Sequence, residues 1–116
     1  MKRFLVILLT LSAALRAEDI RSFTLLQTND IHAHLVPDAK GMGGLAYLAA
    51  ELKHQRQGCK ACVYLDGGDL VQGSPVSTIF KGEPMYELAN QLGIQGDTLG
   101  NHEFDYGWQQ IQKFVK

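Results

Sequence analysis

Apolar and polar residues alternate along the chain in patterns that predict strands and helices in turn. Residues 21–28 contain a short apolar run that suits a buried strand, and Cys62–Asp66 forms a second one. Between them, apolar residues recur at helical spacing and predict a helix from Leu45 to about Gln57, with Gly58 as its stop. The apolar stripe of this helix consists of Leu45, Leu48, Ala49 and Leu52.

The second half of the chain continues this alternation. It predicts a short helix over Val76–Phe80, a helix over Met85–Leu92, a brief strand at about Asp97–Leu99 and a helix that begins near Trp108. The order β-α-β-α-α-β-α is typical of an α/β layered fold with a largely parallel sheet. Because three strands leave two open sheet edges and the last helix has no stop signal, we expect a truncated, N-terminal part of a larger domain with an incomplete sheet.

The first 17 residues have the layout of a secretory signal peptide. Lys2 and Arg3 precede an apolar run over residues 4–15, and Ala17 stands just before the acidic Glu18. The run is too short to span a bilayer, which needs about 20 apolar residues. We therefore expect cleavage after Ala17, an exported protein in the periplasm or outside the cell, and a domain over residues 18–116; an uncleaved anchor is the alternative.

Charge gives little support to a nucleic-acid partner. The formal net charge is −1, and no run of like charges is longer than two residues. A nucleic-acid-binding protein needs a basic face or stripe, and the sequence predicts none.

The two cysteines, Cys59 and Cys62, form a C-x-x-C motif that several interpretations fit. Half of a zinc ribbon requires a second such pair, which is absent from the sequence. A thioredoxin-like redox pair belongs at the start of a helix, where the thiol pKa is lowered, whereas this motif leads into a predicted strand. We favour a local disulfide, with redox, metal-binding or buried free thiols as alternatives.

Three polar clusters follow the three predicted strands: Asp30-Ile31-His32, Gly68-Asp69 and Gly100 to Asp105. In an open α/β sheet, ligands bind in the crevice beyond the carboxyl ends of the strands. The clusters are therefore expected to converge there, although about 70 residues separate the first from the last.

The side chains in the first two clusters suit a divalent metal ion. Asp30 and His32 are two residues apart, so in an extended segment both project to one side, and a carboxylate with an imidazole suits Zn²⁺, Mn²⁺ or Fe²⁺. Asp69 follows two glycines that allow a sharp turn and a close approach, and its carboxylate could bridge two ions. The alternative for Asp69 is a turn residue or a helix N-cap.

The third cluster combines a possible ligand with a possible acid. Asn101 offers an amide oxygen to a metal, and His102 can act as an acid or hydrogen-bond donor. Asp105 could orient the imidazole, as an aspartate does in catalytic His-Asp pairs. Alternatively, Asp105 caps the following helix.

These motifs resemble those of the calcineurin-like metallophosphoesterases, and most closely the group of secreted 5′-nucleotidases and UDP-sugar hydrolases. The resemblance depends on Thr28–His32, Asp66–Asp69 and Leu99–Asp105, with support from Gln72–Ser74 and Phe80–Gly82. It extends from about Phe23 to Lys116.

The resemblance implies a centre of two divalent metal ions, which could be Zn, Mn, Fe or Co. By this resemblance Asp30 and His32 bind the first ion. Asp69 bridges the two ions, and Asn101 binds the second. Further histidines would complete the metal site from beyond Lys116, so we expect this chain alone to be inactive.

The same resemblance implies that His102 and Asp105 form a catalytic dyad and that a small-molecule nucleotide is the substrate. The implied reaction is metal-dependent hydrolysis of a nucleotide phosphoester. Alternatives within the family are a cyclic-nucleotide phosphodiesterase, a nucleotide-sugar hydrolase and a thiosulfohydrolase. Outside it, the alternatives are a non-catalytic truncated product and a small exported thiol-disulfide protein.

The signal-peptide interpretation predicts the N-terminus of the exported protein. N-terminal sequencing of material recovered outside the cytoplasm should begin at or near Glu18, because Ala17 is the small residue before the expected cleavage point. Cytoplasmic protein that retains Met1 would contradict this prediction.

Overall fold

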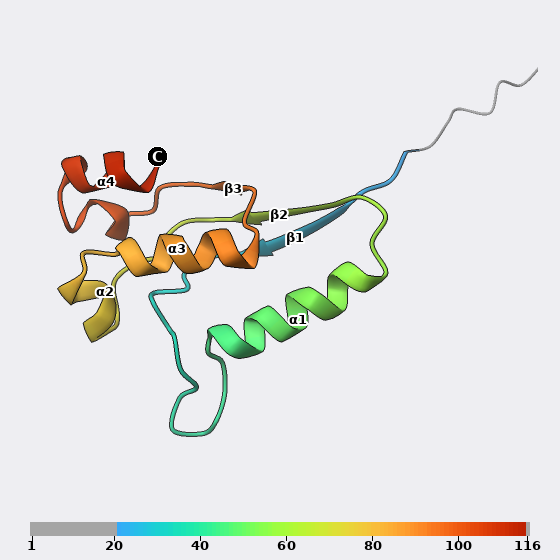
Figure 1. Cartoon of the computed structure of the whole chain (residues 1–116), viewed down its shortest axis with the longest axis horizontal. Coiled ribbons are helices and arrows are strands. Elements are labelled where there is room, and N and C mark those ends of the chain that lie inside the picture. Colours follow the sequence, from blue (N-terminus) through green and yellow to red (C-terminus); the bar gives the residue numbers. More distant parts are fainter. Residues whose placement is uncertain (1–20, 116) are drawn as a thin grey trace, which may run out of the picture.

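The computed structural model describes residues 21–115, so the predicted signal peptide lies outside the described part (Figure 1). The predicted order β-α-β-α-α-β-α is confirmed, with one added 3-10 turn, η1. The elements are β1 (Thr24–Thr28), α1 (Leu45–Gln57), β2 (Cys62–Asp66), α2 (Pro75–Ile79), α3 (Glu83–Leu92), β3 (Gly96–Asp97), η1 (His102–Phe104) and α4 (Trp108–Phe114).

The three strands form one parallel sheet in the order β1-β2-β3. Because β1 and β3 each pair on one side only, the prediction of two open edges is confirmed for the described residues. All three strands run in the same direction, so the segments that follow them emerge at one end of the sheet. This arrangement brings the three polar clusters to the same end of the sheet.

Strand β3 and the turn η1 differ from the prediction. β3 is only Gly96–Asp97, one residue earlier and shorter than the predicted Asp97–Leu99. Its pairing ends where Thr98 N–H donates to Asp66 O at 3.3 Å, and the chain then turns away from the sheet. The three-residue turn η1 was not predicted because an element so short shows no periodic pattern.

One face of the sheet is better covered than the other. Tyr64 is buried on one face, where the guanidinium of Arg56 lies 5.4 Å from its ring centroid. On the opposite face, Leu25 and Leu65 remain 50% and 36% exposed. The expectation that residues 21–28 form a buried strand is therefore wrong for the face that carries Leu25. β1 is an edge strand, and no described helix covers this face.

The hydrophobic core lies between the helices and the segments that follow β1 and β2. Its buried members come from α1, α3 and those segments: Ala33, Leu45, Leu70, Val71, Met85 and Ala89. Since Ala33, Leu70 and Val71 belong to the segments that carry the polar clusters, packing the core also fixes the backbone of the candidate site.

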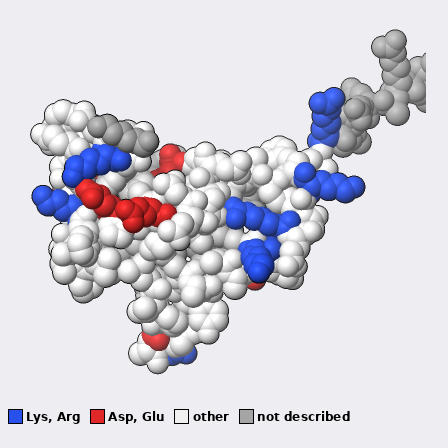
Figure 2. Space-filling model, in the orientation of Figure 1, with Lys and Arg blue, Asp and Glu red and all other residues white. Residues whose placement is uncertain are grey.

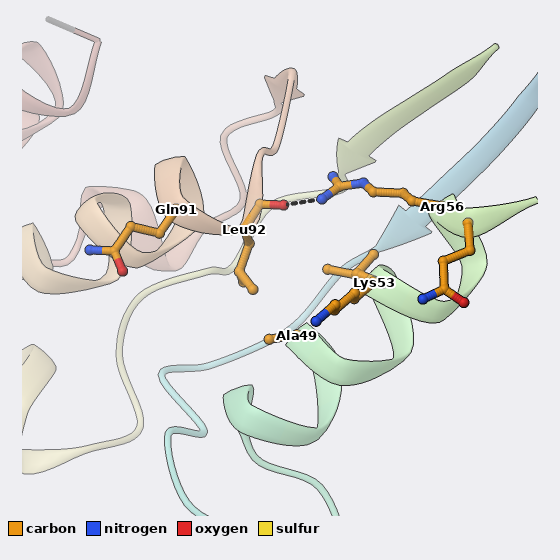
Figure 3. Close-up of a pocket in the computed structure, with 7 residues that line it drawn as sticks. Ala49, Lys53, Arg56, Gln91 and Leu92 are labelled. Carbon is orange, nitrogen blue, oxygen red and sulfur yellow. Dashed lines mark hydrogen bonds between the residues drawn. The ribbon is translucent and has the colours of Figure 1, made fainter. Parts of the chain in front are cut away.

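Arg56 connects α1 to the end of α3 (Figure 3). Its Nη1 donates to Leu92 O at 2.8 Å and its Nη2 to Gly93 O at 3.1 Å, so it satisfies carbonyl groups that a helix terminus leaves free. A pocket of about 420 Å³ lies beside this contact, lined by residues of both helices that include Ala49, Lys53 and Leu92. Arg56 thus holds α1 and α3 together next to β2.

Two surface properties bear on possible partners. Charged side chains of both signs occupy the face seen in Figure 2. Among residues 21–115, no helix combines the length and the apolar character needed to cross a membrane.

Cys59 and Cys62 form a disulfide, with their Cα atoms 5.8 Å apart, which confirms the local disulfide that we favoured. The motif lies between the end of α1 and the first residue of β2. A thioredoxin-like pair at a helix start is therefore ruled out, and sulfur atoms bonded to each other are unavailable to a zinc ion. The bond restrains the turn from α1 into β2.

Replacing both cysteines, in Cys59→Ser/Cys62→Ser, should lower the free energy of unfolding by about 2 kcal/mol, because the bond restricts a short loop in the unfolded chain. Urea denaturation followed by circular dichroism measures this difference. As a control, the reduced unaltered protein should have the same free energy of unfolding as the double variant. Reductant should not change the free energy of unfolding of that variant. Equal stability of oxidised and reduced protein would contradict the prediction.

Candidate metal centre

Three loops at one end of the sheet build the site. Loop 1 comprises residues 29–33 after β1, loop 2 comprises residues 67–72 after β2, and loop 3 comprises residues 98–105 after β3 and includes η1. Loops 1 and 2 continue the pairing of their strands beyond the sheet. The bonds are Asp30 N–H to Gly68 O at 2.9 Å, His32 N–H to Asp69 O at 2.9 Å and Ala33 N–H to Leu70 O at 3.0 Å.

The carboxylate of Glu103 joins loop 2 to loop 3. This side chain is fully buried, at 0% exposure, and four backbone N–H groups donate to it. Oε2 accepts from Gly100 at 2.7 Å and Asp69 at 2.9 Å, and Oε1 accepts from Leu70 at 2.9 Å and Val71 at 3.4 Å. A buried charge costs several kcal/mol unless hydrogen bonds compensate for lost hydration, and these four donors provide that compensation.

Two glycines allow loops 2 and 3 to touch backbone to backbone. A Cβ added at Gly68 would lie 2.6 Å from Gly100 N, and one added at Gly100 would lie 2.2 Å from Asp69 Oδ1. Both distances are far below van der Waals contact, and the second neighbour is a side chain of the candidate site. Any side chain at either position would therefore separate the loops.

The convergence brings together His32, Asp69 and His102, one from each loop. One potential ligand atom from each lies within 4.8 Å of the other two. The two imidazole rings meet edge to face with centroids 5.0 Å apart. The imidazole of His32 and the carboxylate of Asp69 suit a first-row divalent metal, so these two side chains fit the cation that the sequence predicts.

The other two predicted ligands lie beside this group. His32 Nε2 is 3.5 Å from Asp30 Oδ1. The amide group of Asn101 lies next to Asp69. In the amide orientation that gives both its oxygen and its nitrogen a hydrogen-bond partner, the nitrogen lies 3.3 Å from Asp69 Oδ2. All four predicted ligands, Asp30, His32, Asp69 and Asn101, therefore lie close together, and His102 lies beside them.

The backbone at these residues is not extended, which corrects the geometry expected for Asp30 and His32. Their φ angles are 53° and 48°, and Asp69 has a φ of 56°. These values lie in the left-handed region, which costs most residues of order 1–3 kcal/mol and recurs at functional sites. Asp30 and His32 thus come together through a tight turn rather than by projecting from one side of a strand.

His102 and Asp105 form the expected pair. His102 Nδ1 and Asp105 Oδ2 are 2.7 Å apart. This hydrogen bond, assisted by the negative charges of Asp105, Asp69 and Glu103, raises the pKa of His102. The alternative role for Asp105 is not observed, because α4 begins after Gly107 without a side-chain cap. The imidazole is oriented through Nδ1, which leaves Nε2 available to a ligand or a substrate.

Two further carboxyl groups lie near the base of the site. Asp66 is buried and accepts hydrogen bonds from the Thr28 hydroxyl at 2.5 Å and from Gly68 N–H at 3.0 Å. Burial raises the pKa of Asp66 despite these bonds. Loss of hydration, together with the charges of Asp66 and Glu103, raises the pKa of Asp97 to about 6, although Asp97 as a whole residue is exposed, which weakens the effect of this shift on stability.

Sequence reasoning did not assign a role to Glu103, although it lies inside the motif that gave the strongest signal. Its neighbours Asn101, His102 and Asp105 offer recognisable chemistry, whereas a glutamate beside them is typical of an exposed residue. The one available signal was the strict pattern G-N-H-E, which places a carboxylate one residue after a proposed site histidine.

Residues 23–116 match the sequence model of the calcineurin-like phosphoesterases. The chain is 34% identical over 111 residues to a probable 5′-nucleotidase of Treponema pallidum, covering 86% of this chain and 18% of the relative. It is 35% identical over 112 residues to the human 5′-nucleotidase, covering 87% and 20%. The chain thus spans about a fifth of the length of these relatives.

Solved structures show the same similarity. A 5′-nucleotidase precursor from Thermus thermophilus superposes with a TM-score of 0.72 at 32% identity, covering 80% of this chain and 20% of that one. The NAD nucleotidase of Haemophilus influenzae superposes with a TM-score of 0.71 at 30% identity, covering 78% and 18%.

The raised pKa of Asp97 predicts a pH-dependent stability. The protonated carboxyl is favoured in the folded state, so its contribution is complete below the ordinary value of 3.8 and is lost as pH rises through about 6. Asp97→Asn should therefore raise the free energy of unfolding at pH 7.5 by roughly 1 kcal/mol, after allowance for partial exposure. The gain should disappear near pH 4 in urea titrations.

Asp38→Asn is the matched control for this prediction. Asp38 accepts hydrogen bonds from Met42 N–H and Lys40 N–H, which lower the pKa of its carboxyl. Its contribution to stability therefore has the opposite sign: it is present at neutral pH and is lost as pH falls. If both substitutions raised the stability at pH 7.5, or if neither did, the effect attributed to the raised pKa of Asp97 would be contradicted.

Proposed function

Because this chain belongs to the calcineurin-like phosphoesterase family, as its motifs predicted, we propose that the protein hydrolyses nucleotide phosphoesters with two bound divalent metal ions. The observation that carries the proposal is the meeting of His32, Asp69 and His102 at the carboxyl ends of the parallel strands. The chain covers about a fifth of the length of its 5′-nucleotidase relatives. This activity is therefore proposed for the whole protein and not for residues 21–115 alone.

We assign the metal-binding roles residue by residue. Asp30 and His32 would hold the first ion, which the 3.5 Å between His32 Nε2 and Asp30 Oδ1 supports. Asp69, whose carboxylate lies near His32 of loop 1 and accepts from His102 N–H of loop 3, would serve both ions, and Asn101 would hold the second. Bound divalent ions supply the positive charge that polarises a phosphoryl group and activates water for attack.

His102 and Asp105 serve the reacting phosphoryl group in this proposal. The 2.7 Å contact between His102 Nδ1 and Asp105 Oδ2 orients the imidazole, and its raised pKa favours the protonated form. Protonated Nε2 can donate to a phosphoryl oxygen or to the leaving ribose oxygen, where negative charge develops. Asp105 acts through His102 and has no direct role on the substrate.

Ligand number points to additional donors. Asp30, His32, Asp69 and Asn101 are four residues shared by two ions, whereas a catalytic zinc site alone uses three protein ligands. We propose that the remaining donors come from polypeptide outside residues 21–115. Residues 21–115 alone would then bind metal weakly and would not turn over nucleotides at an ordinary enzymatic rate.

A 5′-nucleotide is the proposed substrate, with AMP as the simplest representative. The 5′-nucleotidase names of the relatives in bacteria and mammals support this choice. The similarity to an NAD nucleotidase makes a dinucleotide the main alternative. The signal-peptide pattern of residues 1–17 supports action in the periplasm or outside the cell.

The test is phosphate release from AMP by protein expressed from its complete gene, with Mn²⁺, Zn²⁺ or Co²⁺ added. We expect metal-dependent release that EDTA abolishes. His102→Ala should lower kcat by roughly 10²–10⁴-fold without removing the metals, because this side chain is assigned to proton donation. Asp105→Asn should have a smaller effect of the same kind.

His54→Ala is the matched control, since His54 is 74% exposed on α1, where its Nδ1 lies 3.9 Å from Glu51 Oε1. It should leave kcat unchanged. No phosphate from AMP in a protein that binds Mn²⁺ would contradict the proposed substrate. Loss of metal on changing His102 would make that residue a ligand and remove the proposed dyad.

A further inference from the structure

We propose that Glu103 is a positioning residue for the metal centre, because its carboxylate sets the distance between Asp69 on loop 2 and the Asn101-His102 segment on loop 3. This inference rests on the proposed metal-binding roles of Asp69 and Asn101. It assigns no contact between Glu103 and metal or substrate. Glu103 acts through the backbone of both loops.

The geometry excludes a ligand role for Glu103 itself. Its side chain is fully buried, and all four hydrogen bonds at its oxygens come from backbone N–H groups. Among residues 21–115, no salt bridge includes it. Both oxygens are therefore occupied by backbone donors of the two loops.

The two loops are connected in both directions. The Glu103 carboxylate of loop 3 accepts from the backbone N–H of Asp69, and the Asp69 carboxylate of loop 2 accepts from the backbone N–H of His102 at 2.9 Å. Consequently the backbone and the side chain of Asp69 are both anchored to loop 3. Asp69 cannot move relative to Asn101 or His102 without breaking one of these bonds.

Asp69 needs this support because of its backbone conformation. Its φ of 56° lies in the left-handed region, which persists only where surrounding contacts enforce it. Glu103 supplies three consecutive bonds, to the N–H groups of Asp69, Leu70 and Val71. If the carboxylate were lost, loop 2 could relax toward an extended conformation and carry the Asp69 side chain away from its partners.

A carboxylate is required for this role. Each of its oxygens accepts from two N–H groups, and a Glu103→Gln side chain replaces one oxygen by an NH₂ group that faces two donors. Glu103→Asp keeps the charge but is shorter, so it cannot reach all four donors together. The two variants separate the effect of charge from that of length.

The test compares the unaltered protein, expressed from its complete gene, with Glu103→Gln in two measurements without substrate. Native-state hydrogen exchange by NMR is recorded on metal-free protein, and Mn²⁺ binding is titrated by the EPR signal of free Mn²⁺. Exchange of the Asp69, Leu70 and Gly100 amides should accelerate selectively, while amides of β2 stay protected. Affinity for Mn²⁺ should fall 10–100-fold, as for other groups that orient metal ligands.

Arg56→Met is the control for general loss of stability, because the bonds of Arg56 to Leu92 and Gly93 join α1 to the end of α3, outside the three loops. It should lower stability without changing Mn²⁺ affinity. Glu103→Asp should bind Mn²⁺ more tightly than Glu103→Gln, since the charge is retained.

Several outcomes would overturn the inference. Unchanged Mn²⁺ affinity in Glu103→Gln, or faster exchange spread equally over sheet and loops, would make Glu103 only a structural residue. The same conclusion follows if neither Glu103 variant folds, as judged by circular dichroism at low temperature. Absence of Mn²⁺ binding to the unaltered protein would instead contradict the proposed function itself, and with it the inference that rests on it.

Discussion

The buried carboxylate of Glu103 is the constraint on which the site depends. A charge removed from water requires hydrogen-bond donors, and the backbone N–H groups of Asp69, Leu70, Val71 and Gly100 supply them. These donors belong to two separate loops, so satisfying the charge brings the loops into contact. The contact in turn requires that Gly68 and Gly100 have no side chains. Asp69 and the Asn101-His102 segment become neighbours as a result.

Loop 1 joins this arrangement by a different mechanism. Its backbone continues to pair with loop 2 beyond the end of the sheet, through three N–H donors at Asp30, His32 and Ala33. Both Asp30 and His32 have left-handed conformations, and the side chain of His32 lies near that of Asp69. Backbone pairing therefore places loop 1, and a buried charge places loop 3, with loop 2 common to both.

Periodic patterns were sufficient to predict most of the fold. The bounds of α1 and β2 match the prediction because each has a clear apolar period and a glycine or polar stop. The two-residue β3 and the three-residue η1 are too short for any period, and their positions depend on long-range contacts. For the site, the positions of Asp30, His32, Asp69 and Asn101 followed from strand ends. Their backbone angles and the role of Glu103 depend on contacts between distant segments, which local patterns do not encode.

The separation of Glu103 from its donors along the chain has a consequence for the order in which the molecule assembles. The Glu103 bonds to loop 2 span 32 to 34 residues, whereas α1 and the Cys59–Cys62 disulfide are local. Closing such a span costs chain entropy before any bond repays it, so non-local contacts form late. During synthesis from the N-terminus, Asp30, His32 and Asp69 are all added before residue 103 exists. Until that residue emerges, loop 2 has no partner for its amides, and the nascent chain cannot yet present a finished cation-binding surface.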